Sequence, residues 1–205
     1  MEESRCHPTA AHERLRIPDT YVSSLMLDRA LDAVARRVGP IDREHDIPYL
    51  AGYSRDGKRI YIDRHLPKTF LYRSRAIAVD RYLLLHEEVE KTLIDQLDLH
   101  YQHAHQIATR AEEAAVRADG ISWRAYDRFM QRYVKRMGDE RLVKLPDDLD
   151  LKPYRDEHDY DLMRRMAAAA GDPGHPAHGD PALRRRLAKA LATQAAKAEA
   201  AREKL

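Results

Sequence analysis

The sequence predicts a mostly helical α+β protein in which a small antiparallel β-hairpin packs on a helical body. Apolar residues recur at helical intervals over residues 21–38 and again from about 77 to 137. Between these stretches the spacing changes to that of short strands. Strands followed by a run of helices, rather than alternating with them, are typical of α+β proteins. The length of 205 residues suits one well-packed domain.

The predicted hairpin is formed by IPYLAGYS and KRIYIDRHL, which are rich in Ile, Tyr and Leu. Arg55-Asp56-Gly57-Lys58 between them is a turn signal. We therefore expect two antiparallel strands at about 47–54 and 58–64, with Pro67 ending the second.

The long helical stretch is expected to divide near Leu99 and again at Asp119-Gly120. Ser122 is a suitable N-cap for WRAYDRFMQRYVKRM, whose aromatic residues fall on one face. A shorter helix is expected around DYDLMRRMAAAA, after a loop that contains Pro146 and Pro153.

Composition divides the chain into four parts. Residues 1–20 are expected to be a flexible N-terminal segment, and 21–170 a single globular domain. Residues 171–181, with the sequence GDPGHPAHGDP, are a linker by composition. Residues 182–205 predict a basic, Ala-rich C-terminal helix, largely solvated and a candidate contact for a partner.

The charge balance gives no indication of a polyanionic partner. Lys and Arg total 36 against 34 Asp and Glu, for a net charge of +2, so neither nucleic acid nor an anionic membrane is expected to bind. Nothing in the sequence approaches the apolar length of a signal peptide or a membrane span. Cys6 is the single cysteine, so no intramolecular disulfide forms. We expect a cytoplasmic protein.

Helical geometry places His86 and Glu90 on the core-facing side of the helix that contains LLLHEEVEK, residues 83–91. Successive residues turn by about 100°, so Glu90 lies at about +40° from His86 and Glu87 at about +100°, on the flank. The apolar residues within about 20° of His86 are Val79, Leu93 and Leu97. The residues expected on the solvent side are Asp80, Glu88, Lys91 and Asp95.

A carboxylate on a buried face must be paired, protonated or bound to a cation, and Glu90 is such a carboxylate. His86, one turn earlier, supplies a second ligand at the spacing of zinc-binding helices. The pattern HExxE at residues 86–90 resembles the HExxH helix of the zincin metallopeptidases, with glutamate at the second ligand position. The resemblance implies a bound Zn²⁺ and Glu87 as general base. A carboxylate ligand also admits Fe²⁺ or Mn²⁺.

The zincin resemblance further implies a peptide or protein substrate, held extended along an edge strand that precedes the metal helix. KRIYIDRHL or the shorter RAIAVD is placed for this role. The segment GYSRDGKRIYIDRHLP, followed by HEEVEK, also resembles sequences of small uncharacterised proteins of bacterial and prophage genomes, over about residues 48–166. That similarity implies no activity.

A third ligand is expected from the following helix, HYQHAHQIATRAEEAAVRAD. His105 lies on a face of small and apolar residues, whereas His103 lies on nearly the opposite face. Glu112, two turns on, shares the His105 face and is expected to orient His105 or to bind the metal itself. His100 and His103 are expected in solvent.

The leading hypothesis is a metal-dependent hydrolase, most simply a peptidase, in which Glu87 deprotonates a metal-activated water. The second hypothesis is a non-enzymatic helical interaction protein, of phage or mobile-element origin. In that protein the same residues form a structural metal site or a buried polar network. A carboxylate-rich dimetal protein ranks last, because it would need two ExxH motifs.

Tyr154 and His158, in LKPYRDEHDYDL, are candidates for folding over the site and stabilising an oxyanion. The simpler expectation for both residues is a polar surface loop.

Overall fold

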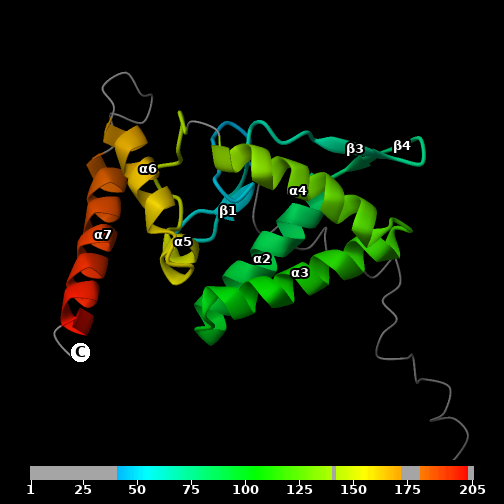
Figure 1. Cartoon of the computed structure of the whole chain (residues 1–205). Coiled ribbons are helices and arrows are strands. Elements are labelled where there is room, and N and C mark those ends of the chain that lie inside the picture. Colours follow the sequence, from blue (N-terminus) through cyan, green and yellow to red (C-terminus); the bar gives the residue numbers. More distant parts are fainter. Residues whose placement is uncertain (1–40, 140–141, 172–180, 203–205) are drawn as a thin grey trace, which may run out of the picture.

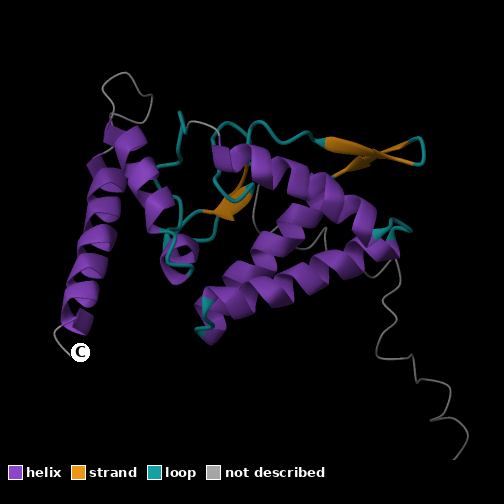
Figure 2. Cartoon of the chain, in the orientation of Figure 1, coloured by secondary structure: helices purple, strands orange, loops and turns teal. Residues whose placement is uncertain are grey.

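The computed structural model describes residues 41–139, 142–171 and 181–202. The described residues form two β-hairpins and six helices. In Figure 1 the last three helices lie at one side of the others, and Figure 2 colours the same view by secondary structure. The elements are β1 (Ala51–Tyr53), β2 (Ile60–Ile62), β3 (Thr69–Tyr72), β4 (Arg75–Ala78), α2 (Asp80–Leu97), α3 (Tyr101–Ala118), α4 (Trp123–Asp139), α5 (Lys152–Asp156), α6 (Tyr160–Gly171) and α7 (Pro181–Arg202). The predicted mostly helical α+β class is confirmed. The expected segment 1–20, the helix at 21–38 and most of the linker lie outside the described residues.

The first hairpin forms where the sequence predicted it. β1 and β2 pair antiparallel, and Gly57 takes a φ of +69° in the turn, a conformation that glycine adopts without strain. Both strands are shorter than the predicted ranges of 47–54 and 58–64. The Asp63 carboxylate accepts hydrogen bonds from the backbone N–H groups of Ile47 and His65, both at 2.8 Å, and so draws the strand ends into loops.

The second hairpin was predicted only in part, since RAIAVD was recognised as a strand but its partner was not. β3 pairs antiparallel with β4 in the register Thr69↔Ala78. Arg73 and Ser74 in the turn both have positive φ, at 48° and 64°. Neither residue is the Asn or Gly that usually marks such a turn in a sequence.

Helices α2 and α3 lie antiparallel against each other and divide close to Leu99, as predicted. Asp98 ends α2 in the left-handed conformation, with φ 48°, and its N–H donates to the Leu93 carbonyl. His100 caps α3 by accepting a hydrogen bond from the N–H of Gln102. The second predicted division, at Asp119-Gly120, is also present.

Helix α4 covers the α2–α3 pair with the aromatic face that the sequence predicted. Tyr126 and Phe129 are buried, and the Tyr126 ring lies edge-on to Phe70 at 5.7 Å and to Tyr82 at 5.4 Å between centroids. These contacts join α4, β3 and α2 in one core.

A second core joins α5, α6 and α7 to the loop that follows α4. Leu183 and Leu187 of α7 are fully buried in this core together with Met163 and Met166 of α6. The C-terminal helix therefore has a packed face, whereas its sequence predicted a largely solvated helix.

The prediction for the polar side of α2 was wrong for two residues. Glu88 and Lys91 were expected in solvent, but both are only 5 % exposed, whereas Leu97 of the expected apolar stripe is 62 % exposed. Both α3 and the β1–β2 hairpin pack on α2. The buried part of the helix surface is therefore wider than a single apolar stripe. Lys91 is stabilised there by ion pairs with Asp95 at 3.0 Å and Asp150 at 2.8 Å.

Within the described ranges, no helix combines the length and the apolar character needed to cross a lipid bilayer.

Packing of α7 is testable through Leu187. Leu187→Ala should lower the free energy of unfolding by about 2–5 kcal/mol, because the substitution leaves a cavity in the second core. Chemical denaturation followed by circular dichroism measures this change. Arg184→Ala on the exposed side of α7 is the control, with an expected change within about 0.5 kcal/mol. Equal effects of the two substitutions would contradict the packed position of α7.

Candidate metal centre

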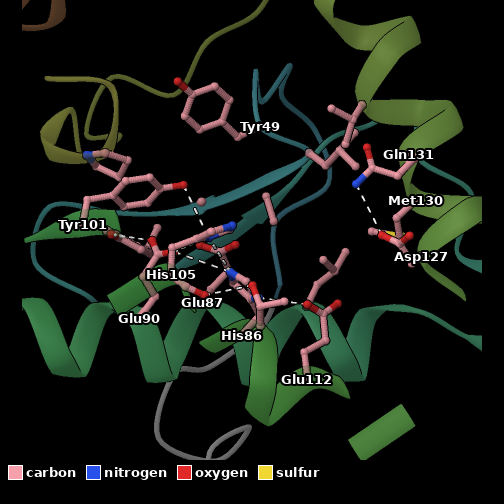
Figure 3. A pocket seen from close by; sticks show the side chains of 18 of the residues that line it. Tyr49, His86, Glu87, Glu90, Tyr101, His105, Glu112, Asp127, Met130 and Gln131 are labelled. Carbon is pink, nitrogen blue, oxygen red and sulfur yellow. Dashed lines mark hydrogen bonds and ion pairs between the residues drawn. The ribbon is translucent and has the colours of Figure 1, made fainter. Parts of the chain in front are cut away.

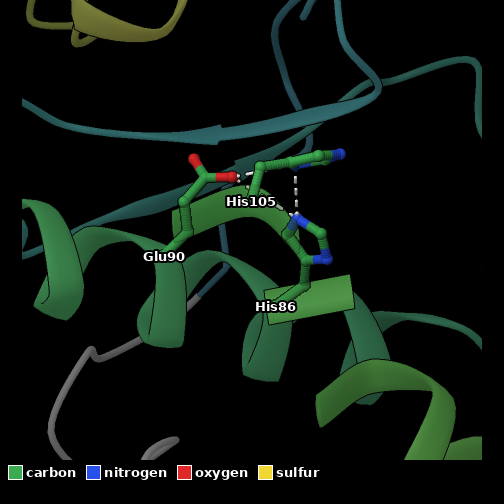
Figure 4. A group of neighbouring side chains, drawn as sticks. All are labelled: His86, Glu90 and His105. Atoms are coloured by element: carbon green, nitrogen blue, oxygen red, sulfur yellow. Dashed lines mark hydrogen bonds and ion pairs between the residues drawn. The ribbon is translucent and has the colours of Figure 1, made fainter. Parts of the chain in front are cut away.

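His86 and Glu90 project from α2 and His105 from α3, and their side chains meet between the two helices (Figure 4). His86 is 6 % exposed and Glu90 is 2 % exposed, as their place on the core-facing side predicted. The His105 side chain is 46 % exposed, so the cluster is closed toward the core and open on one side. Together the three residues form a group that could hold a metal ion.

The three donor atoms face one another at short and similar distances. His86 Nε2 lies 3.1 Å from His105 Nδ1, His105 Nδ1 lies 3.0 Å from Glu90 Oε2, and Glu90 Oε2 lies 3.5 Å from His86 Nε2. Donor atoms bound tetrahedrally at about 2.0–2.1 Å from a zinc ion are about 3.3–3.4 Å apart. The residues therefore fit a metal of that size without rearrangement of the helices.

Glu112 orients His86, and not His105 as the sequence analysis expected. Its Oε2 lies 2.9 Å from His86 Nδ1, which donates the hydrogen bond, and its Oε1 accepts a bond of 2.6 Å from the Tyr126 hydroxyl. The reason is the antiparallel arrangement of the helices. Glu112, two turns after His105 on α3, lies beside the turn of α2 that contains His86, one turn before Glu90. This bond keeps the proton on Nδ1 and leaves His86 Nε2 directed at the cluster.

Tyr53 holds the second carboxylate in a similar way. Its hydroxyl donates to Glu90 Oε1 at 2.9 Å, which leaves Oε2 directed at the two histidines. Tyr101 stacks on His105 with ring centroids 5.3 Å apart. Tyr53 and Tyr126 were not predicted as site residues. One lies in a strand and the other on an apolar helix face, and neither pattern indicates which buried carboxylate a tyrosine will contact.

Glu87 lies beside the cluster and lines the same pocket, although the sequence placed it on the flank of α2. Its side chain is 6 % exposed. Within the described ranges no residue donates a hydrogen bond to its carboxylate. Burial, together with the negative charge of Glu90, raises the pKa of Glu87 well above its ordinary value. A buried carboxyl group with these properties is a strong proton acceptor at a functional site.

The charges within the cluster shift the pKa values of its other members. Burial alone would lower the pKa of His86, but its hydrogen bonds with Glu112 and Glu90 outweigh burial and raise that pKa well above the ordinary value. Burial alone would raise the pKa of Glu90, but the hydrogen bonds of His105 and His86 hold it below the usual range. The carboxylates of the cluster thus favour a positive charge between them, either the proton of His86 or a bound cation that displaces it.

The cluster forms one wall of a pocket of about 210 Å³ (Figure 3). Among the described residues that line the pocket there is no lysine or arginine. The lining carboxylates belong to Glu87, Glu90, Glu112, Asp127 and Asp150. The apolar and aromatic lining comes largely from β1, α4 and α5. A cation would therefore be drawn into the pocket, and an acidic group would be repelled from it.

Tyr154 of α5 reaches this pocket, whereas His158 does not. The Tyr154 side chain is 2 % exposed, so it is not the surface residue that was the simpler expectation. Its hydroxyl has no hydrogen-bond partner in the described part of the chain. Burial, with nearby Tyr49 and the charge of Glu87, raises the pKa of Tyr154 well above its ordinary value, so the phenol keeps its proton.

The strand beside the pocket is β1, and not either of the two segments that the sequence analysis selected. Both edges of β2 are occupied, since it pairs with β1 and also with the backbone of Asp42. The bonds Asp63 N–H to Leu50 C=O and Ser54 N–H to Arg59 C=O set the β1–β2 ladder. In that register the peptide groups of Ala51 point to the outer edge of β1.

The fold and the site together define the class: a mostly helical α+β protein with a candidate His₂Glu metal centre between two antiparallel helices. No protein-family model, curated protein or solved structure matches this chain significantly.

Metal binding can be tested at the two histidines. His86→Ala and His105→Ala should each remove most of the bound metal, because each removes one of three donors. The measurement is elemental analysis of protein purified without a metal-binding tag. His103→Ala is the matched control, because His103 is an exposed histidine on α3 and should leave the metal in place. Loss of metal in His103→Ala but not in His105→Ala would contradict the site.

Proposed function

We propose that the protein is a metal-dependent hydrolase of peptide bonds, with His86, Glu90 and His105 as the metal ligands. The supporting observation is the spacing of the three donor atoms, between 3.0 and 3.5 Å, in a pocket whose charged side chains are predominantly carboxylates. Two imidazoles and one carboxylate with an open side are a ligand set of catalytic zinc sites. Zn²⁺ is the expected ion, and Fe²⁺ or Mn²⁺ are the alternatives that such ligands accept.

Glu87 is the general base of the proposed reaction. Zn²⁺ at this site would act as a Lewis acid and lower the pKa of a coordinated water into the neutral range. The Glu87 carboxylate, which is buried beside the ligands and has no hydrogen bond from the described residues, accepts the proton of the attacking water. It then delivers that proton to the leaving amine.

Tyr154 supplies a hydrogen bond to the substrate. The Tyr154 hydroxyl makes no hydrogen bond to a described residue, so it is available to bond to a ligand in the pocket. This phenol lines the pocket near Glu87 and keeps its proton, so it is suited to donate to the carbonyl oxygen on which negative charge develops.

The outer edge of β1 favours a peptide as the substrate. The C=O of Tyr53 on this edge already accepts a hydrogen bond from the N–H of Asp150 at 2.9 Å. The N–H and C=O of Ala51, which lines the pocket, point to the same edge and bond to no described residue. An extended peptide beside β1 would satisfy those groups by strand addition. The amide bond of the peptide would then lie next to Glu87 and the metal ligands.

The same side chains also suit the alternative of an interaction protein with a metal-free polar core. Both ring nitrogens of His86 have partners within the cluster, at 2.9 Å to Glu112 and 3.1 Å to His105. A protein of that kind would contain no stoichiometric metal. Two equivalents of iron or manganese would instead favour the dimetal alternative.

Substitution of Glu87 by glutamine separates an enzyme from a structural site. The amide keeps the shape of the side chain but cannot accept a proton, so activity should fall by roughly a hundredfold or more. Metal content and melting temperature should be retained. The assay is cleavage of a mixed, unstructured peptide library by the wild type and the variant, with a chelator as control. Cleavage that is equal in both proteins, or that persists in chelator, would exclude the proposed peptidase.

Tyr154→Phe tests the proposed hydrogen bond to the substrate. The substitution removes only the hydroxyl, so kcat should fall by on the order of a hundredfold while KM and metal content change little. Tyr49→Phe is the control, because Tyr49 also lines the pocket but its hydroxyl donates to Asp159 at 3.0 Å. If kcat falls equally in both variants, the role belongs to the aromatic wall and not to the Tyr154 hydroxyl.

A further inference from the structure

A second hollow lies on the other side of α5 from the metal site, between α5 and α7. Figure 1 shows α5 between α7 and the α2–α3 pair. Asp150, two residues before α5, lines both hollows. Pro153 and Tyr154 of α5 line the metal pocket, whereas Lys152 and Arg155 line the second hollow. The short helix α5 is therefore the wall that the two hollows share.

The second hollow is basic, in contrast to the metal pocket. The cations that line it are Arg55, Lys152, Arg155, Arg186, Lys189 and Lys197. Its two carboxylates are already neutralised, because Asp150 pairs with Lys91 at 2.8 Å and Asp156 with Lys152 at 3.5 Å. The described residues that line the hollow therefore carry a net positive charge.

Four of these cations have no ion-pair partner among residues 41–139, 142–171 and 181–202, namely Arg55, Arg155, Lys189 and Lys197. Lys189 and Lys197 are eight residues apart on one face of α7, about 12 Å along the helix axis. Arg186 on the same face donates hydrogen bonds to the carbonyls of Asp147 and Leu149 and so holds α7 against the loop before α5. The basic face is thus directed into the hollow by packing.

We propose that this hollow binds an acidic segment of the peptide or protein that the metal site cleaves. The proposal rests on the proposed peptidase function for its substrate, but the hollow and its charge are independent of the metal. A helix is about 10–12 Å across, and an extended peptide advances about 3.3 Å per residue. The acidic segment therefore begins about three to four residues from the bond that is cleaved.

The charges of the two hollows determine which part of a substrate each of them binds. Carboxylates of a substrate are attracted by the unpaired cations beyond α5, whereas the metal pocket offers them no lysine or arginine among its described lining residues. A nucleic acid fits less well, because the chain has a net charge of only +2. The hollow thus selects protein substrates with an acidic stretch near an uncharged cleavage site.

The kinetic test compares peptides that share one cleavable core sequence. Each carries a tail of four Glu, four Gln or four Lys, which a four-residue spacer joins to either the N-terminal or the C-terminal end of the core. With the Glu tail on the favoured side, KM should be roughly tenfold lower than with Gln at low salt, and kcat should be unchanged. The Lys tail should raise KM. The difference should shrink in high salt, because the charges are exposed and screened.

Lys189→Glu/Lys197→Glu should abolish the preference for the Glu tail, and Lys189→Gln/Lys197→Gln should weaken it. Arg110→Glu/Arg124→Glu is the matched control, because these exposed cations lie on α3 and α4 and do not line the hollow. Melting temperatures verify that all three variants fold. Cleavage without any preference for the Glu tail, or a preference that survives in both Lys189/Lys197 variants, would overturn the proposal.

A binding measurement separates this proposal from the proposed function. Fluorescence anisotropy with a labelled peptide of eight glutamates, which carries no cleavable core, needs no activity. Binding that is lost in Lys189→Glu/Lys197→Glu supports the acidic site even if no peptide is ever cleaved. A labelled oligothymidylate that binds more tightly than the glutamate peptide, with the same dependence on Lys189 and Lys197, would replace the acidic peptide by nucleic acid as the ligand.

Discussion

Burial of ionisable side chains between α2 and α3 is the constraint on which the rest of the structure depends. His86, Glu87, Glu90 and Glu112 are each at most 6 % exposed. A buried charge without a partner costs several kcal/mol, so each of these groups has to be neutralised, paired or bound to a cation. The cluster satisfies this in two ways, by mutual hydrogen bonds and by a raised pKa for Glu87.

The same constraint explains why tyrosines surround the cluster. A phenol donates a hydrogen bond without adding a charge, and burial near carboxylates raises the pKa of Tyr53 and of Tyr126, so both remain donors. Tyr53 comes from β1 and Tyr126 from α4, so the polar cluster connects elements on two sides of the helix pair. Packing of the hairpin and of α4 onto α2 and α3 therefore also sets the orientation of the candidate ligands.

Helix periodicity predicted the centre of the site, because one buried face is enough to select residues on a single helix. His86 and Glu90 on α2 and His105 on α3 were selected in this way, and the two helices bring them together. Periodicity contains no information about the order of contacts between helices, so the partner of Glu112 was predicted wrongly. It also assumes one buried stripe, and the prediction for Lys91 failed because α2 is covered on more than one side.

The contribution of α5 was the least predictable part, because it depends on an ion pair across the fold. Lys91 of α2 forms an ion pair with Asp150, two residues before α5, and lies 5.0 Å from the centroid of the Tyr53 ring. Tyr53 in turn donates to Glu90, so one chain of contacts runs from the candidate metal ligand to the helix that carries Tyr154. Lys91 was assigned to solvent from its residue type and its position on the helix. Its charge nevertheless neutralises Asp150, the carboxylate that lines both the acidic pocket and the basic hollow. The boundary between the two is therefore a consequence of the burial of Lys91.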